Sequence, residues 1–166
     1  MSIRQLIFGS MLVFELGGPL RSAPAASMPG GELVAASGVF DVLNGDRQWL
    51  ASIEYRLAPQ EWGLRPWLGV AASEGTTWFA SAGLLYTVQA DGWRCSLGFA
   101  PSYYTTAVGK QLGEDLEFYS FGEVGYHFQD HQALSVRFGH ISNAHLADKN
   151  PGAEILELGY SIPLPW

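Results

Sequence analysis

The chain carries little charge for its size and has almost no cysteine. Only 15% of its 166 residues are charged, and the single cysteine, Cys95, has no partner for an internal disulfide. No run of 18 apolar residues occurs, which argues against a transmembrane helix. The formal net charge of -7 argues against nucleic acid as a partner, since a phosphate-binding surface needs a basic patch. The sequence has no cysteine and histidine ligand cluster and no glycine-rich phosphate loop, so we expect no cofactor, metal or nucleotide.

Apolar residues are abundant and are spread along segments with a period of two. Hydrophobic residues make up 48% of the chain and aromatic residues 13%. After residue 32, apolar side chains alternate with small or charged ones between turns rich in Gly, Pro, Asn and Asp, which is typical of β-strands. The predicted strands are Leu33–Leu43, Arg47–Leu57, Trp62–Ala72, Thr76–Gln89, Asp91–Tyr103, Leu116–Phe128, Ala133–Ala144 and Ala153–Trp166.

These segments have the length and number of a small membrane barrel. A tilted strand of about ten residues crosses a bilayer, and an even number of antiparallel strands closes without a free edge. We therefore predict an all-β fold, an eight-stranded antiparallel transmembrane β-barrel of the bacterial outer membrane. The charged residues that would point inward are Glu54, Arg56, Arg65, Arg94, Glu123 and Arg137. The aromatic residues that would form an interfacial girdle are Trp49, Trp62, Trp78, Trp93, Tyr103 and Trp166.

The first residues resemble a secretory signal peptide. Arg4 supplies a positive charge, residues 6–16 are mostly apolar, and Ala23-Pro24-Ala25 offers a cleavage site of small residues. The predicted organisation is therefore a signal peptide over residues 1–25 and a barrel over residues 26–166, exported to the outer membrane.

Two further features bear on the barrel interpretation. The last strand alternates up to the terminal Trp166, which resembles the C-terminal signal of bacterial outer-membrane proteins. Pro66 is the difficulty, because proline lacks the hydrogen-bond donor that an interior strand supplies. A bulge at that position or a misplaced boundary of the third strand would resolve it. The alternative fold is a soluble β-sandwich, which would leave the aromatic strand ends unexplained.

A histidine, a serine and a carboxylate share one face of the last predicted hairpin. His140 and Ser142 lie two residues apart, so on a strand their side chains leave the same face roughly 6.6 Å apart. If residue 140 faces residue 154, Glu154 lies about 5 Å from His140. The side chains of these three residues lie on the same strand faces as the apolar residues, and those faces are directed toward lipid. With both termini on the periplasmic side, this hairpin lies at the outer rim. The arrangement indicates a hydrolase triad of nucleophile, base and orienting acid.

The segment Phe138 to Glu154 resembles the active-site signature of the lipid A 3-O-deacylase (PagL) family, in its His-x-Ser-Asn-Ala core, its later Asn-x-Gly and its glutamate. The resemblance implies an outer-membrane barrel that hydrolyses the ester-linked acyl chain at the 3-position of lipid A in lipopolysaccharide. It also implies that Ser142 is the nucleophile, that His140 is the base and that Glu154 orients it. The remaining matched positions, which support the site and the oxyanion, are Asn143 and Asn150.

Alternatives remain at the level of residues and of function. His145 competes with His140 as the base, and both Asp148 and Glu157 compete as the acid, although Glu157 has inward parity. Lys149 is a candidate contact for a lipid A phosphate. The alternative function is a non-catalytic outer-membrane barrel that serves structure, adhesion or small-molecule passage. A second alternative is an acyltransferase. The oligomeric state stays open, with a homodimer among the options.

Overall fold

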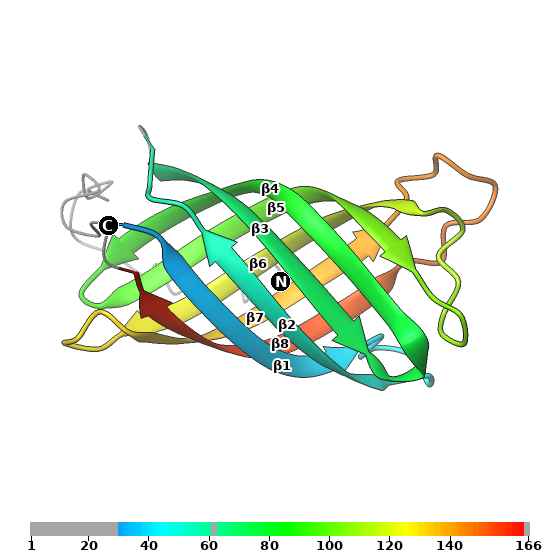
Figure 1. Cartoon of the computed structure of the whole chain (residues 1–166), viewed down its shortest axis with the longest axis horizontal. Coiled ribbons are helices and arrows are strands. Elements are labelled where there is room, and N and C mark those ends of the chain that lie inside the picture. Colours follow the sequence, from blue (N-terminus) through cyan, green and yellow to red (C-terminus); the bar gives the residue numbers. More distant parts are fainter. Residues whose placement is uncertain (1–29, 61–62, 165–166) are drawn as a thin grey trace, which may run out of the picture.

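The computed structural model describes residues 30–60 and 63–164, which form a closed barrel. Its strands are β1 (Glu32–Phe40), β2 (Gln48–Arg56), β3 (Leu64–Ser73), β4 (Thr77–Ala90), β5 (Trp93–Thr105), β6 (Leu116–His127), β7 (Ala133–Ser142) and β8 (Ala153–Pro163), with a short 3-10 turn, η2 (Glu74–Thr76), between β3 and β4. Every strand pairs antiparallel with its neighbours in the chain, and β8 closes on β1 (Figure 1). The predicted eight-stranded antiparallel barrel is confirmed. Within the described ranges, no helix is long and apolar enough to span a membrane.

The connections between strands divide the barrel into two ends. The β1–β2, β3–β4, β5–β6 and β7–β8 connections lie together at one end, on the right in Figure 1, which we call the loop end. The remaining turns lie at the opposite end, together with the start of β1 and the end of β8, and we call it the terminus end. The predicted signal peptide, residues 1–25, lies outside the described residues, as do Trp62 and Trp166.

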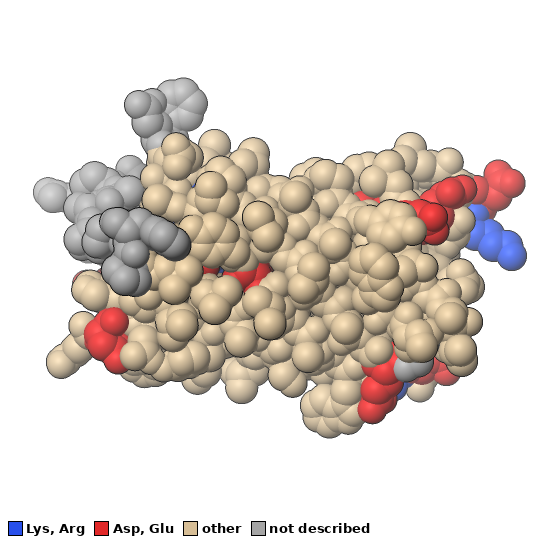
Figure 2. Space-filling view, in the orientation of Figure 1, with Lys and Arg blue, Asp and Glu red and all other residues tan. Residues whose placement is uncertain are grey.

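The outward face of the barrel is an apolar belt. Large hydrophobic side chains are exposed along the strands, among them Ile53, Leu68, Val70, Leu84, Leu97, Phe99, Val136 and Leu158. In Figure 2 the middle of the molecule shows very little charge, whereas acidic and basic side chains gather at the loop end. Aromatic residues lie near both edges of this belt: Trp49, Trp78 and Tyr103 toward the loop end and Trp93 and Tyr126 toward the terminus end. A belt of this kind, bounded by aromatic residues, is typical of barrels that meet lipid.

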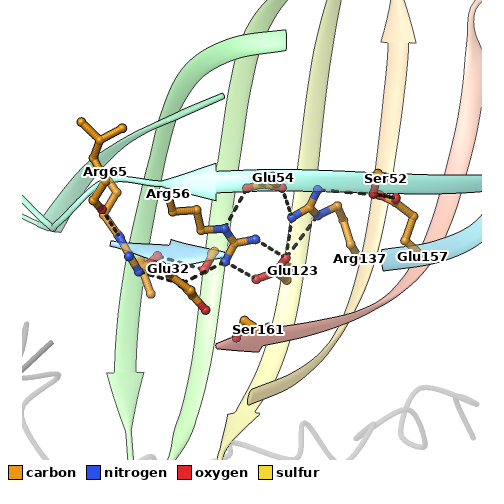
Figure 3. Close-up of polar contacts among 12 residues, drawn as sticks. Glu32, Ser52, Glu54, Arg56, Arg65, Glu123, Arg137, Glu157 and Ser161 are labelled. Atoms are coloured by element: carbon orange, nitrogen blue, oxygen red, sulfur yellow. Dashed lines mark hydrogen bonds and ion pairs between the residues drawn. The ribbon is translucent and has the colours of Figure 1, made fainter. Parts of the chain in front are cut away.

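The inward face carries a network of buried ion pairs toward the terminus end. Arg56 lies between Glu54 and Glu123 and donates to both, with shortest distances of 2.7 Å (Figure 3). Arg137 donates to the same two carboxylates, at 2.7 and 2.8 Å. The other members are Arg65, Arg94, Glu32 and Glu157. Four arginines therefore face four glutamates, so the charges within this network balance. The predicted inward direction of all six charged residues is confirmed.

The loop end of the interior is filled by apolar side chains. The buried residues there include Phe40, Leu50, Phe79, Tyr104, Leu112, Tyr119, Ile141 and Ile155. Between this apolar layer and the ion pairs lies a cavity of about 20 Å³, room for about one water molecule. An interior packed with side chains is normal for eight-stranded barrels, and it argues against the small-pore alternative.

Pro66 lies inside β3, and neighbouring groups compensate for its missing donor. It pairs with Leu84 of β4, and its carbonyl oxygen accepts a hydrogen bond from the Leu57 nitrogen at 2.9 Å. The reciprocal bond, from residue 66 to the Leu57 carbonyl, is impossible for proline. Arg65 Nε takes its place and donates to that carbonyl at 3.0 Å. The pairing of β3 therefore continues past the proline.

Several predicted strand boundaries were wrong by a few residues. The third strand begins at Leu64 and not at residue 62. The first strand was predicted to run to Leu43 but ends at Phe40, because Asp41 adopts φ 57° and begins a turn. The Asp41 carboxylate and carbonyl both accept hydrogen bonds from Asn44, at 2.6 and 3.1 Å. This local hydrogen bonding competes with strand pairing.

The ion-pair network predicts that removing a single buried charge destabilises the barrel. Glu123→Gln keeps the side-chain shape but removes one of the two carboxylates that Arg56 and Arg137 share, which leaves only Glu54 between them. Breaking a buried pair in this way costs about 3–5 kcal/mol. Urea unfolding in detergent, followed by the gel shift between folded and unfolded chain, measures the loss. The control is the exposed Glu74→Gln, which should change stability by less than about 0.5 kcal/mol. Equal stabilities for the two variants would contradict this account of the interior.

Candidate active site

His140 and Glu154 lie in contact on the outward face of the β7–β8 hairpin. The two residues are direct partners in the strand register, which is the pairing on which the proposed closeness of Glu154 to His140 depended. His140 Nδ1 lies 3.3 Å from Glu154 Oε1. Their side chains are 46% and 24% exposed, so the pair is open to its surroundings but partly desolvated. An imidazole next to a carboxylate on the outward face of the barrel needs a reason, because polar groups on a lipid-facing surface are costly.

Ser142 is the last residue of β7 and shares the outward parity of His140. Gly139, Ile141 and Asn143 alternate with these two residues and are buried. Across the sheet, Ser142 faces Phe118 of β6. Among the described residues the Ser142 hydroxyl makes no hydrogen bond to the imidazole, and catalytic contacts of this kind often tighten only when substrate binds. The structure therefore joins His140 to Glu154 directly and places Ser142 two residues along the same face.

Gly152 allows the imidazole of His140 to lie against the backbone at the start of β8. The glycine has φ +59°, and a Cβ built there would lie 2.6 Å from His140 Cε1 and 3.1 Å from Nε2. Any larger residue would push the ring away. The edge of the ring that carries Nε2 therefore faces Gly152, while Nδ1 faces Glu154. The role of this glycine could not be deduced from turn chemistry alone.

Asn143 connects the end of β7 to the loop that follows. It is fully buried, and its side-chain nitrogen donates to the carbonyl oxygens of Leu112 at 3.0 Å and Lys149 at 2.7 Å. Its side-chain oxygen accepts from the His145 nitrogen, and its main-chain nitrogen donates to Asn150 Oδ1, both at 3.0 Å. Both side-chain N–H groups of Asn143 are thus engaged. The contacts suit support of the site, and they leave no free side-chain donor for an oxyanion at this residue.

The β5–β6 loop packs against the β7–β8 loop at the loop end of the barrel. The Leu112 side chain is 1% exposed and belongs to the apolar layer at the loop end. The next residue, Gly113, has φ +112°, and a Cβ there would lie 2.2 Å from the Lys149 carbonyl oxygen. The two loops are therefore in direct backbone contact. Sequence reasoning missed this contact, because nothing in the sequence pattern links residue 112 with residue 143.

Asn150 and His145 complete the loop. Asn150 Nδ2 lies 3.1 Å from His145 Nδ1, while Oδ1 of the same amide accepts from Asn143. His145, the competing base, thus contacts Asn150, and His140 holds the only carboxylate contact of the two. Ala144 and His145 both have positive φ, 54° and 63°. Two consecutive non-glycine residues in this region are costly and persist only where surrounding contacts enforce them.

The remaining candidates lie apart from the pair. Glu157 is inside the barrel, 3.6 Å from Arg137, so its predicted inward parity is confirmed. Asp148 and Lys149 are exposed in the loop, and no ion pair involves either of them in the part of the chain that the structure describes. The described ranges also hold no group of three or more His, Cys, Asp or Glu residues placed for a metal ion.

An open groove runs along the outward face beside His140. It is lined by Leu97, Gly98, Ser120, Phe121, Gly122, Phe138, Gly139 and His140. The groove exists because Ser120 and Gly122, on the outward face of β6, are small, whereas Leu97 and Phe138 on the adjacent strands are large. The signal in the sequence was the gap that Ser120 and Gly122 leave in the apolar row between Phe118 and Val124.

Comparison with known proteins places this geometry in a family. The lipid A 3-O-deacylase (PagL) model matches residues 34–163. The crystal structure of the outer membrane enzyme PagL is similar with a TM-score of 0.59 at 24% identity, covering 80% of this chain and 99% of that chain. The crystal structure of Neisserial surface protein A (NspA) gives a TM-score of 0.57 at 14% identity, covering 83% and 98%. A designed transmembrane β-barrel gives 0.58 at 14% identity, covering 82% and 97%. No curated protein matches the chain.

The structural neighbours show that the fold is the eight-stranded barrel of outer-membrane proteins. The family match runs from β1 to β8 and includes the whole β7–β8 hairpin, and the chain therefore belongs to the lipid A 3-O-deacylase (PagL) family. The family prediction made from residues 138–154 is confirmed.

Proposed function

We propose that this protein hydrolyses the ester-linked acyl chain at the 3-position of lipid A by a serine esterase mechanism. The observation that carries the proposal is the contact between His140 and Glu154 on the outward face, with Ser142 on the same face, in a member of this family. All three residues come from one hairpin of one chain. The triad is thus complete without a second copy, whatever the oligomeric state.

The contact between His140 and Glu154 sets the chemistry of the imidazole. An ionised carboxylate only accepts hydrogen bonds, so the proton of the neutral ring lies on Nδ1, which faces Glu154. The lone pair is then on Nε2, where it can accept the proton of Ser142. Glu154 also stabilises the imidazolium that forms. This assignment makes Ser142 the nucleophile, His140 the general base and Glu154 the orienting acid.

The reaction proceeds in two halves. Ser142 Oγ attacks the acyl carbonyl carbon as its proton passes to His140, and the bond to the sugar oxygen breaks as that oxygen takes the proton back. The products of this half are the 3-hydroxyl of lipid A and an acyl-serine. Water then attacks the acyl-serine with His140 again as base, which releases the fatty acid and restores Ser142. The exposure of His140 leaves a path for that water.

Asn150 is the better oxyanion donor of the two predicted asparagines. Its Nδ2 carries two N–H groups, and His145 engages one of them. The other remains for the developing negative charge, whereas Asn143 has both side-chain N–H groups engaged. Losing an oxyanion donor typically costs about 2.7–4 kcal/mol of barrier. Asn143 acts instead as the support that holds the loop.

The groove beside His140 suits the acyl chain of the substrate. Its walls are the side chains of Leu97 and Phe138, and its floor is the backbone at Ser120 and Gly122. An acyl chain that lies there stays in an apolar environment while its ester reaches the triad. The groove opens outward, so a lipid enters from the membrane without passing through the barrel.

The setting that this function requires is the outer leaflet of the outer membrane. The apolar belt and the fold support insertion, and lipopolysaccharide in that leaflet supplies the substrate. Export by a signal peptide over residues 1–25 and a mature barrel over residues 26–166 are part of the proposal. The non-catalytic alternative gives no role to the contact between His140 and Glu154 on the lipid-facing surface. The acyltransferase alternative uses the same acyl-serine and differs only in the acceptor.

Replacing the nucleophile tests the function. Ser142→Ala should abolish release of 3-hydroxy fatty acid from lipid A, because it removes the hydroxyl that the proposal makes the nucleophile. The other hydroxyl on this face, that of Ser120 on β6, donates to the His140 carbonyl oxygen instead. The barrel should stay folded, since a rim serine makes few contacts. Mass spectrometry of lipid A from cells with each variant gives the readout. Ser37→Ala, at an exposed outward serine of β1, is the matched control and should retain activity. Unaltered release by Ser142→Ala would reject the triad, and an acyl group found on a second acceptor would favour the transferase.

Filling the groove tests where the acyl chain lies. A Cβ at Gly122 would meet only Leu97 Cδ2, at 3.9 Å, so Gly122→Leu should fold. Its side chain occupies the groove, and a displaced substrate should react roughly 10- to 100-fold more slowly. Ala51→Leu places the same side chain at an exposed position on β2 and should leave the rate unchanged. Kinetics on purified lipopolysaccharide compare the two, and equal rates would show that the acyl chain lies elsewhere.

A further inference from the structure

Three hydrogen bonds join Asn143, Asn150 and His145 into a closed ring directly after the nucleophile. The Asn143 main-chain nitrogen donates to Asn150 Oδ1 at 3.0 Å. Asn150 Nδ2 lies 3.1 Å from His145 Nδ1. The His145 main-chain nitrogen donates back to Asn143 Oδ1 at 3.0 Å. We call these three residues the loop ring.

The donors and acceptors of the loop ring permit a single arrangement. The Asn143 main-chain nitrogen can only donate, so the amide atom of Asn150 that faces it is the oxygen. The other amide atom is then the NH₂ group, which also can only donate. His145 Nδ1 must therefore accept, which requires a neutral imidazole with its proton on Nε2. If both imidazole nitrogens were protonated, the Nδ1–H of His145 would face the Nδ2–H of Asn150. Two donors cannot form a hydrogen bond, so the loop ring would open.

We propose that His145 is a positioning residue for the deacylation, acting through Asn150. The neutral imidazole holds the Asn150 amide, which in turn holds the backbone of Asn143 next to Ser142. The same contact directs Nδ2 of Asn150, so the orientation of the oxyanion donor depends on the imidazole. This inference rests on the proposed function, because it concerns the same site.

The backbone of the turn does not by itself hold Asn150 in place. Ala144 and His145 both lie in the left-handed region, at φ 54° and 63°, where non-glycine residues are disfavoured. Leu146 donates to the Asn143 carbonyl oxygen at 3.0 Å, which closes the turn, but this bond does not reach Asn150. The side chain of His145 supplies the missing link between the turn and Asn150. Without it, the Asn150 amide is held only at Oδ1, by the Asn143 main-chain nitrogen, and Nδ2 loses its partner.

The nearby charged groups do not compete for this role. Lys149 and Asp148 are exposed in the same loop, and Lys149 contributes its carbonyl oxygen, which Asn143 engages. Glu154 is paired with His140. The imidazole of His145 is thus the group that contacts the Asn150 NH₂ in the described part of the chain.

Two substitutions at position 145 distinguish a positioning role of the imidazole from a purely structural role. In His145→Asn, Oδ1 is attached to Cγ where Nδ1 of histidine is, so the acceptor remains, and asparagine tolerates positive φ. In His145→Ala the acceptor is lost. We expect His145→Ala to lower kcat on lipopolysaccharide by roughly 10- to 100-fold with KM unchanged, because the site is intact but misaligned. His145→Asn should restore most of that loss.

A matched control is available at the other end of the barrel. His131 has φ 65° and is exposed in the β6–β7 turn. His131→Ala makes the same chemical change at the same kind of backbone, and its kcat should equal that of the wild type. The gel shift of unheated samples gives the folded fraction of each variant, so kcat is expressed per folded molecule.

A double variant tests whether His145 acts through Asn150. In an Asn150→Ala background, the further change His145→Ala should have no added effect, since coupled residues are not additive. An unchanged kcat in His145→Ala, a His145→Asn variant as slow as His145→Ala, a change confined to KM, or additive losses in the double variant would each overturn the proposal. Activity of Ser142→Ala would overturn the proposed function instead, so the two failures are distinguishable.

Discussion

The pairing of Arg137 with Glu157 inside the barrel determines which residues of β7 and β8 face outward. The two are direct register partners, 3.6 Å apart, and Arg137 also binds Glu54 and Glu123. Three residues along the same register, His140 faces Glu154 on the outer surface. A slip of one residue would place the arginine in the lipid and the histidine in the core. The buried charges thus hold the candidate active site on the outside of the barrel.

The other half of the site depends on packing at the loop end. Leu112 fills the top of the apolar layer, and its carbonyl oxygen holds the buried amide of Asn143. Gly113 lets the two loops touch. Ser142 therefore lies between a strand anchored by Ile141 and a loop anchored from a different hairpin. A rigid support of this kind gives a site on the barrel surface the preorganisation that catalysis needs.

The fold could be predicted almost entirely from the sequence, because the alternation of apolar and polar residues along a strand indicates which face of the barrel each side chain lies on. The same rule placed His140 and Glu154 on the outward face, whereas their direct pairing was a condition on the hairpin register that the structure meets. Strand ends were less certain, since Asp41 turns the chain through its own hydrogen bonds, and Glu32, a member of the ion-pair network, lay just before the predicted first strand. The contact between Leu112 and Asn143 joins segments 31 residues apart and has no local signal. The fold depends on periodicity, whereas the loop geometry depends on tertiary packing.

The central claim is that Glu154 and Glu157, which lie on opposite faces of β8, have different roles. Glu154 belongs to the proposed triad on the outward face, and Glu157 belongs to the ion-pair network inside the barrel. Turnover of lipopolysaccharide per folded molecule, measured for Glu154→Gln and Glu157→Gln, tests it most directly. Glu154→Gln should lose about 10⁴-fold, the effect of an acid-to-amide change in a comparable triad, while keeping wild-type stability. Glu157→Gln should weaken the barrel through Arg137 and keep near-normal turnover. A larger loss of turnover in Glu157→Gln would contradict both the register and the lipid-facing site.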